Sequence, residues 1–137
     1  MVVTEAMRLY PPAYGIGRQA ARATEIAGQS ITPGDILVAP TWVVHRDRRW
    51  FEEPDVFRPE RWAGDLAHRL PRYAYFPFGG GPRQCIGNAF AMMEAVLVLA
   101  TIAQRFRLTM EPGQRVTPTP YVTLRPEPGL RMRLERR

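Results

Sequence analysis

The sequence predicts a mainly α-helical protein with small β-sheets, an α+β arrangement, and three observations support this class. One long apolar stretch of helical character runs over residues 86–106. The strand-like segments are few, short and interrupted by Pro or Gly, so they predict small sheets rather than one large sheet. Between residues 47 and 78 the chain is rich in Pro and Arg and too irregular for either element.

The N-terminal part predicts one helix and then short strands. Residues 2–10, VVTEAMRLY, can form a helix, and the pair Pro11 and Pro12 ends it. The sequence TPGD predicts a turn that pivots on Pro33 and Gly34. The strand-like pieces are, in chain order, IGRQAA (16–21), TEIAG (24–28), QSI (29–31) and DILVAP (35–40).

The remaining elements follow from their apolar patterns. Residues 41–47, TWVVHRD, predict a single helical turn. The meander at 47–78 is long for a small domain, and a loop of this kind usually wraps another part of the protein or a ligand. The helix at 86–106 is apolar on most faces, so we expect it to be central and buried. The tail, residues 107–137, predicts strands divided by Pro and Gly.

Composition narrows the function classes. The formal net charge is +6, and all basic residues are Arg, which indicates either coding bias or repeated use of the guanidinium group. These arginines are scattered, and no helix-turn-helix, zinc-finger or ribonucleoprotein pattern is visible, so nucleic-acid binding is not predicted. The segment AFAMMEAVLVLATIA is too short to span a bilayer and contains Glu94, so no membrane segment is expected in this chain.

The single cysteine limits the chemistry further. One Cys excludes an internal disulfide and a cysteine-built zinc site, and it fits a reducing compartment. We therefore expect a cytoplasmic location, with any N-terminal anchor outside this chain, and, as a separate expectation, a bacterial protein.

The loop FPFGGGPRQCIGNAF, residues 76–90, carries that cysteine. Cys85 lies at the start of the long predicted helix, where unpaired N–H groups and the helix dipole favour a thiolate. The glycines at 79–81 let the backbone approach closely, and Gly87 leaves room for something flat against the helix start. Arg83 can pair with a carboxylate beside the sulfur.

Three interpretations of Cys85 stay open on these residues. A single axial thiolate, clearance for a planar body and an arginine for acidic groups together favour haem. A cysteine at a helix start can also be a nucleophile, with His45 or His68 as its base. A lone Cys can equally be a small buried apolar residue.

The loop resembles a known signature. FGGGPRQCIG matches the haem-binding motif of the cytochromes P450, F-x-x-G-x-R-x-C-x-G, at every fixed position, namely Phe78, Gly81, Arg83, Cys85 and Gly87. Together with two further motifs, this one identifies the protein as a member of that family, and the resemblance covers nearly the whole chain.

Two further motifs stand in the order of the family. EAMR resembles the E-x-x-R motif of its K helix, with Glu5 and Arg8, and FRPERW resembles its PERF motif, with Arg61 as the arginine and Trp62 replacing the final Phe. The resemblance implies that Glu5, Arg8 and Arg61 form a buried structural network that holds the meander.

The resemblance also implies a cofactor and its ligands. Haem b, iron protoporphyrin IX, would be held by Cys85 as axial iron ligand, with Phe78 screening the sulfur. Other family positions imply cofactor contacts from the loop residues Gly79, Gly81, Arg83 and Gly87, and contacts to haem propionates from Arg18 and His45.

The implied activity is that of a monooxygenase, which inserts one atom of O2 into a small organic, lipophilic substrate. A ferredoxin or a flavin reductase domain would supply electrons, and Arg69, Arg72 and Arg105 are candidates for docking it. His68 and the C-terminal arginines are expected to be solvated surface.

The chain would be the C-terminal haem-binding portion, residues 1–137, of a P450 domain, from the K helix onward. The distal residues of the family's I helix do not occur in it, so no catalytic residue is assigned. Alternatives are a haem-thiolate peroxygenase, isomerase or dehydratase, a non-catalytic remnant, and a cysteine hydrolase.

Overall fold

A computed structural model describes all residues, 1–137, and its elements confirm the predicted α+β class. The helices are α1 (Val2–Leu9), α2 (Thr41–Val44), α3 (Leu66–Arg69) and α4 (Asn88–Arg105), with the 3-10 turns η1 (Pro59–Trp62) and η2 (Gly81–Arg83). The strands are β1 (Ile16–Gln19), β2 (Thr24–Ile26), β3 (Gln29–Ile31), β4 (Ile36–Ala39), β5 (Phe106–Met110), β6 (Thr117–Pro120), β7 (Leu124–Glu127) and β8 (Met132–Arg136).

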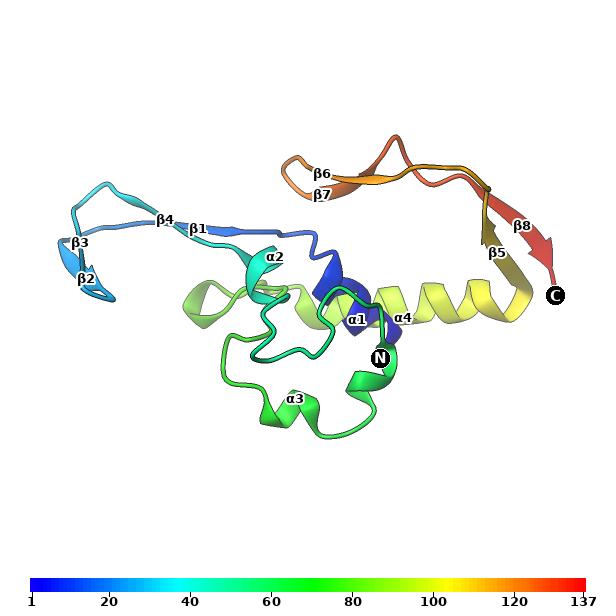
Figure 1. Cartoon of the computed structure of the whole chain (residues 1–137), viewed down its shortest axis with the longest axis horizontal. Helices are drawn as coiled ribbons and strands as arrows, with labels where there is room; N and C mark the ends of the chain where they lie inside the picture. The colour runs from blue at the N-terminus through cyan, green and yellow to red at the C-terminus, as the bar shows by residue number, and fades with distance from the viewer.

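The strands form four separate two-stranded antiparallel sheets, as the short, broken segments predict. β1 pairs with β4 and encloses the pair β2–β3, so this region extends as an arm from the rest of the molecule (Figure 1). β5 pairs with β8 and encloses β6–β7 in the same nested way. The predicted TPGD turn is present: Gly34 has φ +97°, and the Asp35 carboxylate accepts bonds from the N–H and hydroxyl of Thr32 at 2.7 and 2.9 Å.

The buried residues gather around α1. Leu9, Phe51 and Ala74 are the buried apolar side chains, and four buried polar or charged residues accompany them, namely Glu5, Arg8, Thr41 and His45. Most of these come from α1, from α2 and from the meander. The meander therefore wraps α1, which is the role that its length predicts.

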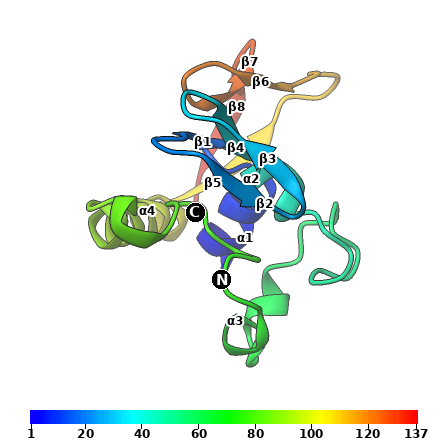
Figure 2. The same ribbon diagram turned by 90° about the vertical axis from the view of Figure 1, so that its left-hand side faces the viewer.

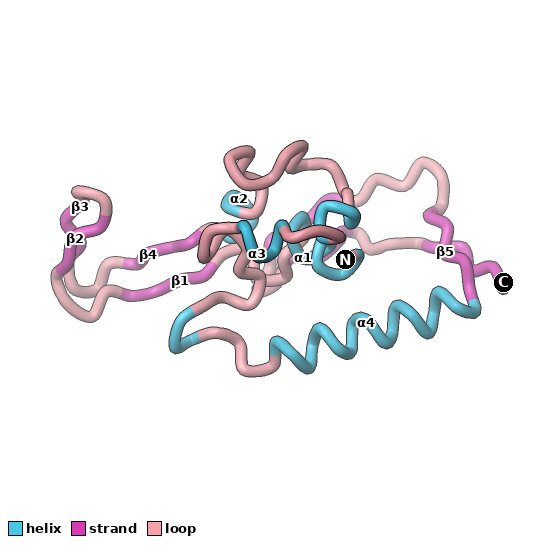
Figure 3. Tube along the Cα trace, turned by 90° about the horizontal axis from the view of Figure 1, so that it is seen from below, coloured by secondary structure: helices cyan, strands magenta, loops and turns pink.

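The prediction of a buried long helix is wrong for this chain. No residue of α4 is buried, and large apolar side chains such as Phe90, Leu97 and Val98 are 64%, 58% and 51% exposed. The main neighbours of α4 are α1 and β5, so its apolar faces have little to pack against. Figure 3 shows α4 running along one edge, with a loop before it and strand β5 directly after it. The helix also begins at Asn88 rather than residue 86.

None of the helices combines the length and the apolar content that crossing a membrane requires. Figure 2 shows α1 near the middle of the molecule, with α4 to one side of it and α3 below. The loop that carries Cys85 leads directly into α4, and the site is therefore built at the junction of α4 with the region around α1.

Candidate haem-binding site

Glu5 is the centre of a buried ion-pair network. It lies three residues before Arg8 on α1, and the two side chains form a bidentate pair, with Arg8 Nε 3.0 Å from Oε2 and Arg8 Nη2 2.9 Å from Oε1. Arg61 Nε donates to Oε1 at 2.9 Å, and Trp62 Nε1 donates to Oε2 at 2.8 Å. The backbone N–H of Arg58 adds a bond of 3.0 Å. One carboxylate thus joins α1 to the PERW turn.

Arg8 extends this network to the meander through backbone carbonyls. Its Nη1 donates to the carbonyls of His45 and Pro54, at 2.8 and 2.7 Å, and its Nη2 donates to that of Val56 at 3.3 Å. The side chains of Glu5 and Arg8 are both fully buried. Because every charge here has close partners, the desolvation cost of burying it is offset, and losing one partner would strand the others.

The environment of Glu5 favours its ionised form. Burial by itself would raise the pKa of this carboxyl, but hydrogen bonds from Arg8, the Arg58 backbone, Trp62 and Arg61 lower it to about 2. Glu5 is therefore a carboxylate at every pH at which a cell operates, and the network stays charged.

The cysteine loop is closed by one backbone bond. The N–H of Cys85 donates to the carbonyl of Phe78 at 3.0 Å, and between them Gly79 and Gly81 have φ of +74° and +69°. These are left-handed conformations, which glycine adopts without steric cost. Cys85 is exposed and free, three positions before Asn88, the first residue of α4.

Strand β1 lies against this loop. A Cβ on Gly79 would sit 3.3 Å from the Ile16 side chain, so the strand and the loop are in close contact. Since side chains two apart on a strand share a face, Arg18 lies on the same face of β1 as Ile16. A hollow of about 490 Å³ opens there, and its lining includes Ile16, Arg18, Leu37, Phe76 and Gly80.

These residues fit a haem. The loop offers one accessible thiol, and Ile86 beside it is fully exposed, so a flat group can approach the sulfur. Gly87 lies close to the sulfur: a Cβ built on it would be 3.9 Å from Cys85 Sγ, an ordinary van der Waals distance. The Arg18 guanidinium bonds only to the carbonyl of Gly17, at 2.8 Å, which leaves donors for a carboxylate. A thiolate, an apolar wall and a free guanidinium suit an iron porphyrin with acidic side groups.

The two histidines lie in different environments. His45 is fully buried, and its Nε2 accepts the N–H of Phe76 at 2.8 Å. A side chain sealed in this way offers no open face to a haem propionate, the contact that the resemblance implies, and none to Cys85 as a base. His68 is exposed on α3, as expected.

The arginines suggested for docking are all exposed. Arg69 pairs with Asp65 at 2.8 Å, one helical turn away, and Arg72 lies over the ring of Tyr73 with 4.9 Å to its centroid. Arg105 is the last residue of α4. Arg83 is also exposed, in η2.

Two side-chain contacts with α1, one of them in the network, were not predicted from the sequence. The indole of Trp62 donates to Glu5, and the hydroxyl of Tyr75 donates to the carbonyl of Thr4 at 3.1 Å. The replacement of Phe by Trp in the PERF-like motif is visible in the sequence, and its N–H is a clue to an additional donor. Nothing in the local sequence of Tyr75 distinguishes it from the neighbouring Tyr73.

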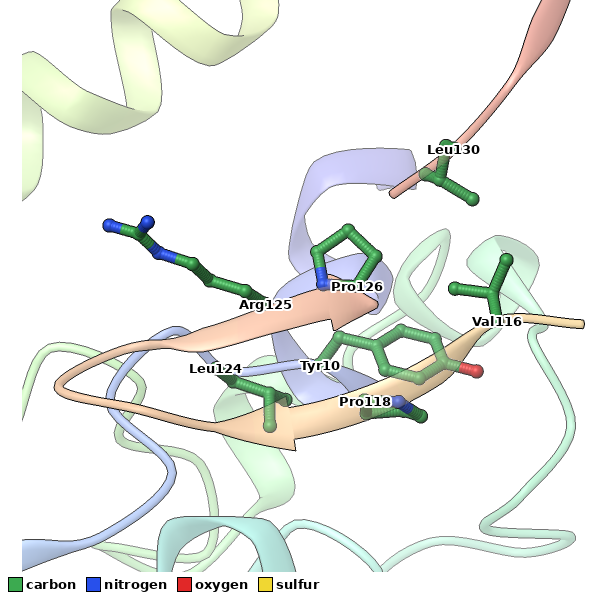
Figure 4. Close-up of a pocket in the computed structure, with 7 residues that line it drawn as sticks. All are labelled: Tyr10, Val116, Pro118, Leu124, Arg125, Pro126 and Leu130. Atoms are coloured by element: carbon green, nitrogen blue, oxygen red, sulfur yellow. The ribbon is translucent and has the colours of Figure 1, made fainter. Parts of the chain in front are cut away.

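A second hollow, of about 480 Å³, lies where the end of α1 faces the β6–β7 hairpin (Figure 4). Tyr10 lines it together with apolar residues of the hairpin region, and Arg125 extends away from the others. Nearby, the Tyr14 hydroxyl donates to the carbonyl of Tyr121 at 2.9 Å. The N–H of Leu124 donates to the carbonyl of Pro12, also at 2.9 Å. The segment after α1 is thereby tied to the hairpin tip.

An accessible thiol in a left-handed glycine loop, beside a strand that carries a free arginine, defines a haem-thiolate class of site. Comparison with known proteins gives the same class. The family model described as Cytochrome P450 matches residues 1–133. The chain belongs to the cytochrome P450 family, and haem is the cofactor that this membership implies.

Several relatives are similar over most of this chain. Cyclooctatin synthase of Streptomyces melanosporofaciens is 45% identical over 132 residues, which cover 96% of this chain and 28% of the relative. Pentalenene oxygenase of Streptomyces avermitilis is 37% identical over 136 residues, which cover 99% of this chain and 30% of the relative. The solved structure of retinoic acid bound cyanobacterial CYP120A1 superimposes with a TM-score of 0.89 at 32% identity, covering 98% of this chain and 32% of that one. The chain thus spans about a third or less of the length of these proteins.

Proposed function

We propose that residues 1–137 form the haem-binding portion of a P450 monooxygenase, an enzyme that inserts one atom of O2 into a small lipophilic organic compound. The observation that carries this proposal is Cys85, an exposed thiol in a glycine loop whose spacing matches the family signature. When bound, a thiolate-ligated haem supplies activation of oxygen. The residues of this chain hold and orient that group.

Each site residue has a role in this proposal. Cys85 would hold the haem iron through its thiolate, Phe78 would cover the sulfur, and Gly79, Gly81 and Gly87 would give the backbone and the haem room. Arg18 binds a propionate, which its free donors and its place on the wall of the hollow support. Arg83, exposed in η2, would bind an acidic haem group. The cofactor is haem b, the iron porphyrin that the family motif implies.

The network of Glu5, Arg8 and Arg61 has a structural role. Its bonds join α1, the PERW turn, the carbonyl of His45 and two meander carbonyls, and its members lie in the interior rather than on the hollow beside the cysteine loop. It stabilises the surroundings of the loop and takes no part in the chemistry.

The electron donor is a ferredoxin or a flavin reductase domain with an acidic docking surface. Arg72 and Arg105 are exposed, and Arg69 is exposed although paired. Reversing the charge of all three is expected to slow reduction and to weaken its dependence on salt, because steering of an acidic partner is lost. Reduction that is unchanged in rate and salt dependence would contradict this docking surface.

The substrate class and the location complete the proposal. The tip of the β6–β7 hairpin and the segment after α1 meet through Tyr14 and Tyr121, and the hollow beside them is mainly apolar, which supports a lipophilic substrate. Relatives named for pentalenene and for cyclooctat-9-en-7-ol act in Streptomyces, which supports a bacterial protein. A cytoplasmic location is supported by the single, unpaired cysteine.

An isotope experiment tests the reaction type. The chain within its complete polypeptide, supplied with an electron donor, would be incubated with pentalenene or cyclooctat-9-en-7-ol under ¹⁸O2. A monooxygenase places one labelled atom in the product and requires the electrons. A peroxygenase would instead work with peroxide and no donor, an isomerase or dehydratase would leave the product unlabelled, and a remnant would give no product in either assay.

A further inference from the structure

We propose that His45 is a positioning residue for the haem ligand: its Nε2 atom accepts the N–H of Phe76 and so fixes the start of the cysteine loop to the buried network. This proposal rests on the proposed function, because it assigns His45 a role toward Cys85. It replaces the direct propionate contact that the family resemblance implies, since the imidazole is fully buried.

The contact itself is well defined. Phe76 N lies 2.8 Å from His45 Nε2. The imidazole stacks on the ring of Tyr75, with centroids 5.0 Å apart and planes inclined by 29°, and it meets Phe76 edge-on at 5.3 Å and 82°. The other ring nitrogen, Nδ1, is buried without a hydrogen-bond partner. The bond to Phe76 is the hydrogen bond that orients the ring, and the carbonyls of Arg8 and Met7 also act on it.

A continuous series of bonds runs from the network to the cysteine. Arg8, paired with Glu5, donates to the carbonyl of His45 at 2.8 Å, and the His45 side chain accepts from Phe76. The carbonyl of Phe76 accepts the N–H of Gly79 at 2.9 Å, which closes the turn into the first left-handed glycine of the loop.

Beyond that turn, the carbonyl of Phe78 accepts the N–H of Cys85 at 3.0 Å. His45 is the one residue in this series that bonds to both parts, to the network through its backbone carbonyl and to the loop through its side chain. Without its acceptor, the Phe76 N–H would be left unpaired, and of the bonds that tie this segment to the region of α1 the one from Tyr75 to Thr4 would remain.

The protonation state of the ring fits this role. Because Nε2 accepts a bond it carries no proton, so the neutral imidazole has its proton on Nδ1. Burial lowers the pKa of His45 to about 4 despite the opposing carbonyls of Arg8 and Met7, and the charges of Arg8 and Arg46 lower it further. Tyr75 also faces the ring, and burial raises the pKa of its hydroxyl. His45 thus stays neutral, and able to accept, at the pH of a cell.

The test compares three variants of the full chain by NMR and needs no haem. His45→Phe keeps an aromatic ring of similar size but has no acceptor, His45→Gln can place an amide oxygen near the Nε2 position, and His68→Phe is the matched control on the exposed α3. We expect exchange of the Phe76 amide to rise about tenfold in His45→Phe, because one hydrogen bond is lost. The Phe76 amide should exchange at about the wild-type rate in His45→Gln and in His68→Phe.

Two further readouts keep the proposal open to refutation. If His45→Phe does not fold, the ¹⁵N shifts of the wild-type imidazole decide: an unprotonated Nε2 supports the proposal and a protonated Nε2 overturns it. In a folded His45→Phe, a Phe76 amide that exchanges at the wild-type rate would overturn the proposal. A rise in exchange at the Tyr10 amide, which bonds to the last turn of α1, as large as the rise at Phe76 would overturn it too.

The consequence for the ligand is measured separately. With haem added to the complete polypeptide, His45→Phe should lower the fraction of thiolate-type ferrous–CO absorbance severalfold, and His45→Gln should retain it. If Phe76 exchanges faster in His45→Phe than in wild type but the ferrous–CO spectra of the two proteins are equal, His45 anchors Phe76 without positioning the ligand. That result overturns the proposal. A failure of wild type to show any thiolate-type band would count against the proposed function instead.

Discussion

At the scale of single residues, Glu5 is the side chain on which the most contacts depend. It receives five hydrogen bonds: two from Arg8 and one each from Arg61, Trp62 and the Arg58 backbone. Two of these partners are guanidinium groups with little or no exposure. Removing the carboxylate charge would therefore leave two buried cations without their counter-ion.

Glu5→Gln is expected to lower the free energy of unfolding by about 3–5 kcal/mol, because breaking a buried pair leaves uncompensated charge. Urea unfolding followed by circular dichroism measures this. Glu52→Gln is the matched control, since Glu52 pairs with Arg58 at 3.2 Å but its side chain is 83% exposed, so a loss of under about 1 kcal/mol is expected. Equal losses in the two variants would contradict the structural role of Glu5.

Residue roles that belong to a spaced motif were predictable from the sequence. Glu5 and Arg8 stand three apart on one helix face, which places them together, whereas their meeting with Arg61 was implied by the resemblance of the two motifs to those of the family. His45 could not be placed, because its neighbours in sequence do not indicate that Phe76 will lie against its ring. Contacts of this kind depend on long-range packing, which no local pattern encodes.

At the scale of elements, α1 and α4 have opposite environments although both contain apolar faces. Leu9 of α1 is 3% exposed, whereas Leu97 of α4 is 58% exposed. The meander encloses α1, while α4 has mainly α1 and β5 as neighbours. The stability of this chain should accordingly depend on α1 and hardly on the apolar side chains of α4.

Leu9→Ala is expected to cost about 2–5 kcal/mol of unfolding free energy, because it removes buried methyl groups and leaves a cavity. Leu97→Ala, the same chemical change on α4, should cost under about 1 kcal/mol, because that side chain is already largely in water. Denaturant midpoints of the two variants make the comparison. Similar shifts in both would mean that α4 is covered in solution.

The existence of most elements followed from the sequence, but their burial did not. QSI is β3 at the predicted bounds, and TWVV forms the expected helical turn. The apolar pattern of α4 correctly predicts a helix, yet burial depends on what lies beside it, and this chain places little there. The spacing of apolar residues shows which faces of a helix are apolar, but it does not show what packs against them.

At the scale of the whole molecule, two buried groups make stability depend on pH in separate ranges. The folded pKa of Glu5 is lowered from 4.5 to about 2, and that of His45 from 6.5 to about 4. In both cases the unfolded chain binds the proton more readily than the folded one. Stability therefore falls as pH falls through each range.

We expect the unfolding free energy to be flat between pH 6.5 and about 9, to drop by about 3 kcal/mol between pH 6.5 and 4 through His45, and to drop again below pH 4.5 through Glu5. Chemical denaturation across this range measures the profile. His45→Gln should flatten the upper step and leave the lower one. A wild-type profile without the upper step would show that His45 is not buried in its neutral form.

Ligation of a haem iron by Cys85 is the assignment on which the other cofactor contacts depend. The ferrous–CO absorption spectrum of the haem-supplied protein, wild type beside Cys85→Ser, measures it without an electron donor or a substrate. We expect the red-shifted band of thiolate-ligated haem in the wild type and its loss in Cys85→Ser. Identical spectra of the two proteins would refute the assignment, because the iron would then be held by another group.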